Sequence, residues 1–263
     1  MTHIFTFIGT AILSFLSSLE KFGAFIIFQI QLIPLFFKRP FRVKQIFEQL
    51  ENIGVNTFWV IALTALFTGM VEAVQLFQGF SKFGAESFMG YTIFISITKE
   101  LAPVFSALML ISRAISAMAA ELGTMRVTEQ IDAIETLAVD SKKYLLIPRI
   151  VASTIALPLL VVVFDFVSNL SAFLISWLML DMNPVSYTDT IKQLLSFSEI
   201  GTGILKGLVF GYMVGSIGAF VGYHTKGGAK GVGESTTKAV VLSAISIFIA
   251  NYFLSAIFMI LDW

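Results

Sequence analysis

Ionisable side chains inside long apolar tracts are the residues of this sequence with the greatest potential for chemistry. Glu72, Arg113 and Asp165 each lie within such a tract. A charge at the centre of a membrane helix costs about 2.5 to 3.5 kcal/mol on insertion scales, so each of them needs a partner or water. Arg113 can neutralise Asp165 on a neighbouring span, or these residues can serve transport. The residues alone leave both interpretations open.

The sequence contains few residues of the types that usually carry out catalysis. The only histidines are His3 and His224, far apart in the sequence, and there is no cysteine. We see no serine-histidine pairing and no metal-ligand spacing, so we expect neither an enzyme nor a metal site, and no cofactor of its own. Seventeen basic residues balance seventeen acidic ones, which gives no reason to expect a nucleic-acid partner.

Composition places the chain in a membrane. Of 263 residues, 57% are hydrophobic and 13% are charged, whereas soluble domains carry about 25% charged residues. Helices of about 20 apolar residues cross a hydrocarbon core of about 30 Å. We therefore predict an all-α integral membrane protein with five transmembrane helices, at residues 57–80, 92–120, 145–180, 204–223 and 238–261.

The segment before the first span is predicted to lie in one leaflet. Glu20 and Lys21 divide residues 4–37 into two apolar halves, each short for a crossing. We interpret residues 1–50 as an N-terminal interfacial or elbow helix followed by a basic cytoplasmic segment, and residues 51–263 as a membrane-spanning domain. The basic stretch KRPFRVK at 38–44 is typical of a headgroup surface.

The distribution of positive charge sets the orientation. The predicted inner flanks hold twelve basic residues and the outer flanks three, so the C-terminus is expected outside. The inner set is Lys21, Lys38, Arg39, Arg42, Lys44, Arg126, Lys142, Lys143, Arg149, Lys226, Lys230 and Lys238, and the outer set is Lys82, Lys192 and Lys206.

The third apolar tract is long enough to raise the possibility of two spans. About 36 residues at about 1.5 Å each exceed one bilayer crossing. However, residues 164–169 contain no Gly, Pro or basic residue to form a turn, so we predict one long helix. A short periplasmic helix is expected at 187–198, with Asn183 and Pro184 at its start.

A short amphipathic segment at 129–140 follows the second span and lies on the predicted inner side. Acidic residues early in a helix suit its positive N-terminal dipole. Its apolar face holds Ile131, Ile134, Leu137 and Ala138, and its acidic face holds Glu129, Asp132 and Glu135, with Arg126 just before it. Amphipathicity alone is equally compatible with an ordinary solvated loop helix.

The amino-acid sequence of this region resembles that of the MlaE (YrbE-type) permeases of lipid-transporting ABC systems, which work with MCE proteins. The matching stretches are ELAPV at 100–104, AAELGTMRVTEQIDA at 119–133, LAVD at 137–140 and GVGESTTKAV at 231–240. We interpret the overlapping stretch GGAKGVGESTTK at 227–238 as a flexible cytoplasmic turn before the last span rather than a phosphate-binding loop, because Glu234 stands where the loop requires lysine. No ATPase site is visible in the chain.

The resemblance identifies residues 51–263 as an MlaE-like permease domain, and it implies partners and a function. It implies a homodimeric permease subunit in the bacterial inner membrane that moves phospholipid, with a cytoplasmic ABC ATPase that binds ATP and a periplasmic MCE-domain protein; an accessory regulatory subunit is possible. Residues 129–140 become the coupling helix that docks into the ATPase. The implied ATPase-coupling residues are Arg126, Glu129, Ile131, Asp132, Ile134, Glu135 and Leu137.

The resemblance also implies a lipid cavity between the first two spans. A cation near the outer leaflet can meet a phosphate, and an apolar wall can hold acyl chains. The candidates are Met70, Val74, Phe77, Phe80, Lys99, Glu100, Leu101 and Val104, with Glu72 as an unexpected charge in the wall. The alternative from a different class is an ion-coupled secondary transporter that uses intramembrane acidic residues.

Overall fold

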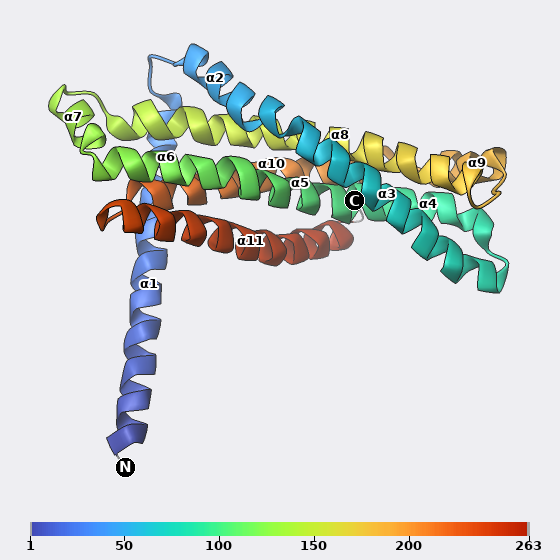
Figure 1. The fold of residues 1–263 in the computed structure, drawn as a ribbon, viewed down its shortest axis with the longest axis horizontal. Helices are drawn as coiled ribbons and strands as arrows, with labels where there is room; N and C mark the ends of the chain where they lie inside the picture. The colour runs from blue at the N-terminus through green and yellow to red at the C-terminus, as the bar shows by residue number, and fades with distance from the viewer. Residues whose placement is uncertain (1, 262–263) are drawn as a thin grey trace.

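The chain is a bundle of long helices crossed at one end by a single projecting helix (Figure 1). The computed structural model describes the backbone of residues 2–261 and the side chains of residues 13, 16 and 19–261. Within this part the chain contains no strand, which confirms the predicted all-α class. The helices outside the long spans are α1 (Thr2–Phe37), α2 (Val43–Ile53), α7 (Gln130–Thr136) and α9 (Pro184–Leu194).

The bundle itself is made of five long helical stretches. The second combines three α-helices with two π-helical turns, and the third begins with a π-helical turn. In order they are α3 (Phe58–Phe80); α4 (Met89–Ser96), η4 (Ile97–Leu101), α5 (Ala102–Leu110), η5 (Ile111–Ile115) and α6 (Ser116–Val127); η6 (Lys142–Leu146) and α8 (Ile147–Leu178); α10 (Phe197–Tyr223); and α11 (Gly228–Ile260). Short 3₁₀ turns η1 (Val55–Thr57), η2 (Ser81–Phe83) and η3 (Glu86–Phe88) flank α3 and α4.

Six helical stretches of the described chain are long and apolar enough to cross a membrane. They begin with Leu19–Phe37 and include all five predicted spans, so the protein is a multi-pass membrane protein. The third span is one continuous helix, as predicted, because α8 runs unbroken through Asp165. It lies between α3 and α10, and its fully buried Phe164 stacks on Phe105 of α5, with ring centroids 6.1 Å apart.

The predicted N-terminal helix is present in the structure. It is one continuous helix from Thr2 to Phe37, because Glu20 and Lys21 are good helix formers and do not interrupt it. Figure 1 shows α1 leaving the bundle nearly at right angles to the long helices. Phe28 is buried against the end of α10, where its ring meets Phe220 edge to face at 5.2 Å. The interfacial role of α1 stays a prediction.

Two helices begin at other residues than the sequence predicted. The GGAKGVGESTTK stretch was interpreted as a turn, but α11 already begins at Gly228, where Gly227 at φ 90° supplies the left-handed residue before the helix. The predicted external helix at 187–198 starts earlier, at Pro184. Asn183 caps it as expected, because its side-chain oxygen accepts a hydrogen bond from the Val185 amide at 2.9 Å.

Glycine allows α10 to approach α8 closely. A Cβ atom at Gly211 would lie 2.5 Å from the Ser153 carbonyl oxygen and 2.9 Å from the Thr154 Cα. Close backbone packing of this kind replaces the hydrophobic drive that membrane helices lack between one another. It also limits how α10 can shift along α8, and with it the position of Lys206, which lies five residues before Gly211 on α10.

Candidate functional site

A buried lysine organises a polar network inside the bundle. Lys206 on α10 has a side chain that is only 1% exposed. Its Nζ donates hydrogen bonds to Glu100 Oε1 at 2.8 Å, to Ser255 Oγ at 2.8 Å and to the Lys99 carbonyl oxygen at 2.7 Å. All three ammonium protons therefore have acceptors, which is the condition for keeping a charge in a membrane interior.

The Lys99 carbonyl is available because of a proline. Pro103 has no N–H, so it cannot donate to the carbonyl four residues earlier, which is that of Lys99. The helix widens into the π-helical turn Ile97–Leu101 just before this point. The Lys99 carbonyl accepts a hydrogen bond from Lys206 at this point, and Glu100 of the same ELAPV motif accepts from the same ammonium group.

Further contacts extend this group into what we call the Lys206 network, comprising Tyr91, Lys99, Glu100, Glu199, Lys206, Asn251 and Ser255. Asn251 Nδ2 donates to Glu100 Oε2 at 2.8 Å, and Ser255 Oγ donates to Oε1 at 2.9 Å. On the other side, Tyr91 donates to Glu199 at 2.9 Å, and Lys99 Nζ lies 4.0 Å from the same carboxylate. The network therefore joins α4, η4, α10 and α11.

A cavity of about 240 Å³ lies against this network. It combines charged and hydroxyl side chains with apolar ones from the end of α11, and its lining is Lys99, Glu100, Thr202, Lys206, Ser255, Phe258 and Met259. The sequence predicted Lys99 and Glu100 here. It missed Lys206, which we expected on an outer flank because the fourth span was drawn from residue 204, whereas α10 begins at Phe197.

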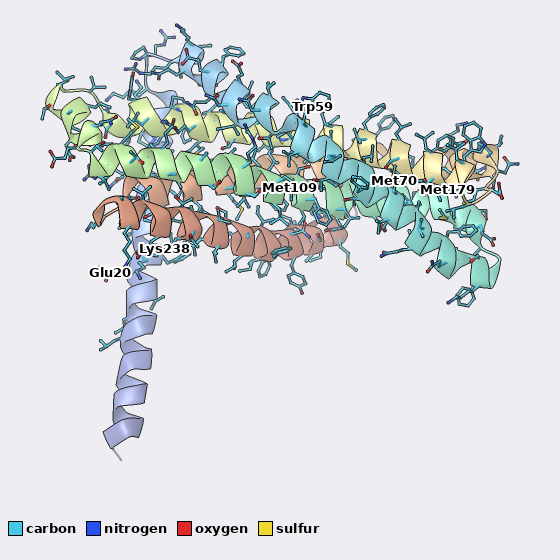
Figure 2. All side chains as sticks on the ribbon, viewed as in Figure 1. Glu20, Trp59, Met70, Met109, Met179 and Lys238 are labelled. Atoms are coloured by element: carbon cyan, nitrogen blue, oxygen red, sulfur yellow. The ribbon has the colours of Figure 1, made fainter. Side chains whose placement is uncertain are left out.

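The remaining lipid-wall candidates lie on the first two spans as predicted. Phe77 and Phe80 of α3 are partly buried and pack against the core, as do Leu101 and Val104 of the second span. Val74 is 38% exposed on the outer surface of α3. Figure 2 marks Met70 on the same helix. Their role in lipid binding stays a prediction.

The pairing of Arg113 with Asp165 is wrong. Arg113 Nη1 instead donates to Thr57 Oγ1 at 2.9 Å and to the Asn52 carbonyl at 3.1 Å, where α2 meets α3. Asp165 lies beside Thr98, which is 15 residues from Arg113 along the second span. At about 1.5 Å per residue this separation is about 22 Å, too far for an ion pair.

The carboxylates of Asp165 and Glu72, which the sequence places inside apolar spans, have no ionic partner among the described residues. Asp165 Oδ1 is enclosed and accepts no hydrogen bond from them, although the Thr98 hydroxyl is adjacent. Glu72 is half-buried on α3. Neither belongs to the Lys206 network, so the sequence grouped three charges that the fold keeps apart.

The predicted coupling segment at 129–140 contains a shorter helix, α7 (Gln130–Thr136). Ile131 is fully buried and Ile134 packs against the core, as the amphipathic pattern predicted. Leu137 differs, because α7 ends before it and its side chain is 76% exposed. Glu129 precedes the helix in a left-handed conformation, with φ 59°.

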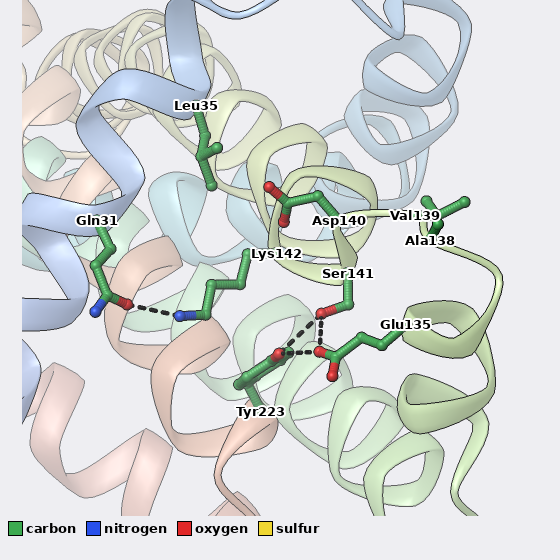
Figure 3. Close-up of a pocket in the computed structure, with 9 residues that line it drawn as sticks. All are labelled: Gln31, Leu35, Glu135, Ala138, Val139, Asp140, Ser141, Lys142 and Tyr223. Atoms are coloured by element: carbon green, nitrogen blue, oxygen red, sulfur yellow. Dashed lines mark hydrogen bonds between the residues drawn. The ribbon is translucent and has the colours of Figure 1, made fainter.

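Hydrogen bonds tie α7 to the end of α10 (Figure 3). Ser141 Oγ and Tyr223 Oη both donate to Glu135 Oε1, at 2.5 Å and 3.0 Å. These two donors hold the pKa of the Glu135 carboxyl below its ordinary value, the Ser141 contribution being the larger. Because Tyr223 is the last residue of α10, these hydrogen bonds join α7 to the helix that carries Lys206.

The rest of this end is partly charged and open. Arg126 Nη1 pairs with Asp132 Oδ1 at 2.7 Å, and its guanidinium lies 5.7 Å above the Tyr223 ring. Beside the tie is an open recess of about 560 Å³, to which Gln31 and Lys142 contribute a hydrogen bond of 2.6 Å. Glu129 and Asp132 remain exposed outside it.

A multi-pass bundle with an internal ion-pair network and a short surface helix tied to one span is typical of a transporter membrane subunit. The Permease MlaE family matches residues 46–257, which is more than half of the chain. The chain therefore belongs to the MlaE permease family, whose members are ABC transporter permeases, and such a permease requires a partner ATPase.

Curated relatives agree with this assignment. A probable ABC transporter permease protein of Rickettsia bellii is 40% identical over 239 residues, covering 91% of this chain and 92% of the relative. One from Synechocystis is 41% identical over 208 residues, 79% of each chain. The chloroplastic protein TRIGALACTOSYLDIACYLGLYCEROL 1 of Arabidopsis thaliana is 38% identical over 211 residues, 80% of this chain and 60% of the relative.

Proposed function

We propose that this protein is the membrane subunit of an ABC transporter that moves phospholipid between the membrane and an MCE-domain partner. The subunit is not itself an enzyme, and ATP is bound and hydrolysed by the separate ATPase. The observation that carries the proposal is the tie from α7 to Tyr223, the last residue of α10, since α10 also carries the buried Lys206. Family membership favours this reading over an ion-coupled transporter.

The ATPase contact is assigned to the outer surface of α7. Glu129, Asp132 and Leu137 are exposed there, while Ile131 anchors the helix from below. An exposed leucine between acidic residues is a suitable centre for a protein contact, because apolar area contributes binding energy and the surrounding charges contribute specificity. We propose that ATP-driven closure of the ATPase moves α7 and, through Glu135, α10.

The lipid contact is assigned to the cavity beside the Lys206 network and the apolar side chains of α3 and α5. The charge of Lys206 is already neutralised by Glu100 at 2.8 Å. Lys99 Nζ lies farther from its partner, at 4.0 Å from the Glu199 carboxylate, and the Lys99 side chain is 28% exposed. Lys99 is therefore the better phosphate ligand, and Lys206 positions Glu100 and the π-helical turn. The Arabidopsis relative's name includes a diacylglycerol lipid, which supports a lipid as the cargo.

The assembly is proposed as a homodimer in the bacterial inner membrane. The support for it is that a single bundle makes half of a typical ABC transmembrane unit. The positive-inside rule favours α7 on the cytoplasmic side and the C-terminus on the periplasmic side. The MCE-domain partner would then meet the α9 end.

Charge reversal at α7 tests the proposal. We expect Glu129→Lys with Asp132→Lys to reduce co-purification of the ATPase about tenfold, because about 1.4 kcal/mol of electrostatic complementarity corresponds to that factor. Lysine and glutamate tolerate the left-handed backbone at residue 129 equally poorly, so backbone strain cancels. Glu48→Lys with Glu51→Lys on α2 is the matched control, because both residues are exposed and the change in charge is the same. Normal membrane insertion with normal lipid transport in the double variant would contradict the assignment.

A further inference from the structure

A second pocket lies at the α7 end of the bundle, where α1 turns into α2. We call it the elbow pocket. It encloses about 220 Å³ between the end of α1, the connecting segment 38–42, α2 and the start of α8. Its lining is Leu35, Phe36, Lys38, Pro40, Phe41, Arg42, Ile46, Lys143, Ile147, Pro148 and Val151. None of these residues belongs to the Lys206 network or to α7.

The charge of the elbow pocket is entirely positive. Lys38 and Arg42 come from the connecting segment 38–42 and Lys143 from η6, more than 100 residues later, and no lining residue is acidic. None of the three makes an ion pair with another residue of the described chain. The N-terminus of α2, which follows Arg42, adds its own partial positive charge. Three uncompensated cations that converge in this way are a site for an anion.

The arginine in particular is held ready for a ligand. The Arg42 guanidinium stacks over the Tyr144 ring at 4.3 Å, which fixes its orientation. Its Nε is enclosed by protein yet has no hydrogen-bond acceptor among the described residues. An enclosed donor without an acceptor is rare, because the loss costs about 1 to 3 kcal/mol. A phosphate oxygen in the pocket would supply the missing acceptor.

The rest of the lining decides which phosphate compound fits. Phe36, Phe41, Ile147 and Val151 form an apolar wall beside the cations. A free phosphate has no use for such a wall, whereas an acyl chain does. The basic residues also lie on the predicted cytoplasmic side, where basic pockets between membrane helices bind acidic headgroups. A zwitterionic lipid would bring its ammonium group toward three cations.

We propose that the elbow pocket binds one anionic phospholipid of the cytoplasmic leaflet, with its phosphate on Lys38, Arg42 and Lys143. This lipid joins α1 to α8 and is separate from the transported cargo, since it lies at the opposite half of the bundle from Lys99. The inference is independent of the proposed ATPase and MCE partners.

The test uses purified full-length protein in neutral detergent, titrated with phosphatidylglycerol, phosphatidylcholine or sodium phosphate and measured by native mass spectrometry. We expect phosphatidylglycerol to bind at least tenfold more tightly than phosphatidylcholine. The elbow variant replaces Lys38, Arg42 and Lys143 by glutamine and should lose this preference. The control variant replaces Lys44, Lys226 and Lys230 by glutamine, removes the same charge from the same end and should retain it.

A pocket-filling variant, Val151→Phe, keeps every charge and separates lipid from free anion. We expect this variant to weaken the binding of phosphatidylglycerol at least fivefold. Equal binding of the two lipids, or an equal loss in the control variant, would overturn the proposal. Phosphate that binds as tightly as phosphatidylglycerol, with no effect of Val151→Phe, would show a free-anion site instead. If the elbow variant fails to fold, the Val151→Phe result decides.

Discussion

Replacing Lys206 by methionine should be among the most damaging single changes in the bundle. Methionine fills a similar volume but leaves Glu100 without its cation. Removing one member of a buried ion pair costs about 3 to 5 kcal/mol. The Glu100 side chain is 44% exposed and keeps Asn251 and Ser255 as donors. We therefore expect a loss of unfolding free energy at the lower end of that range. A loss of about 3 kcal/mol corresponds to about a 100-fold change in the folding equilibrium.

A double-mutant cycle isolates the interaction. Glu100→Gln alone should cost about 2 kcal/mol, because Lys206 then keeps only neutral acceptors in a buried site. The double variant should cost about 3 kcal/mol, which leaves a coupling energy of about 2 kcal/mol. The assay is reversible unfolding in mixed micelles with sodium dodecyl sulfate, followed by tryptophan fluorescence.

The control for this cycle is an exposed pair at the α9 end. Lys192 lies 3.6 Å from Asp189, and both side chains are more than half exposed. Lys192→Met should change the free energy of unfolding by less than about 0.5 kcal/mol. If Lys206→Met and Glu100→Gln are additive to within about 0.5 kcal/mol, the network does not hold the four elements together and the reasoning fails.

Three further predictions concern other parts of the fold. Because the pKa of Glu135 is lowered, its hydrogen bond with Tyr223 contributes stability above the ordinary carboxyl pKa of 4.5, and this stability is lost as the pH falls through the folded pKa. A spin label at Thr136→Cys should therefore gain mobility on acidification, and the midpoint of that change should lie at higher pH in Tyr223→Phe. A midpoint that does not move would refute the tie. Gly211→Ala should destabilise the bundle by about 2 kcal/mol in the same unfolding assay because its Cβ meets Ser153, whereas Gly79→Ala, with nothing within 4 Å, should not; equal effects would contradict this packing. Lys99→Glu should lower phospholipid photocrosslinking from nearby positions, while Lys82→Glu should not, and unchanged crosslinking would remove Lys99 from the lipid site.

Helix existence could be predicted from this sequence because membrane helices are long and apolar. The unbroken α8 followed from the lack of turn residues near Asp165. The burial of Ile131 followed from helical periodicity. Helix ends were less predictable, since Gly228 and the following glycines lie within the first turns of α11 although their composition is typical of a turn.

The polar contacts could not be predicted from sequence. Lys206 and Glu100 are 106 residues apart, and only the packing of α10 against the second span brings them together. Arg113 found its partners on η1 and α2 rather than on Asp165, because the level of a residue within the bundle depends on helix tilt and register. One signal was available: Pro103 frees a carbonyl acceptor and therefore predicts a donor from another helix.

The central claim is that this permease works with a separate ATPase and carries phospholipid. The most direct measurement is purification from the native membrane in mild detergent, followed by mass spectrometry of the associated proteins and lipids. Our account predicts an ABC ATPase, an MCE-domain protein and bound phospholipid, with the ATPase lost in the Glu129→Lys and Asp132→Lys variant. A chain that purifies without an ATPase, under conditions that preserve other ABC complexes, and that drives ion-coupled flux alone would contradict it.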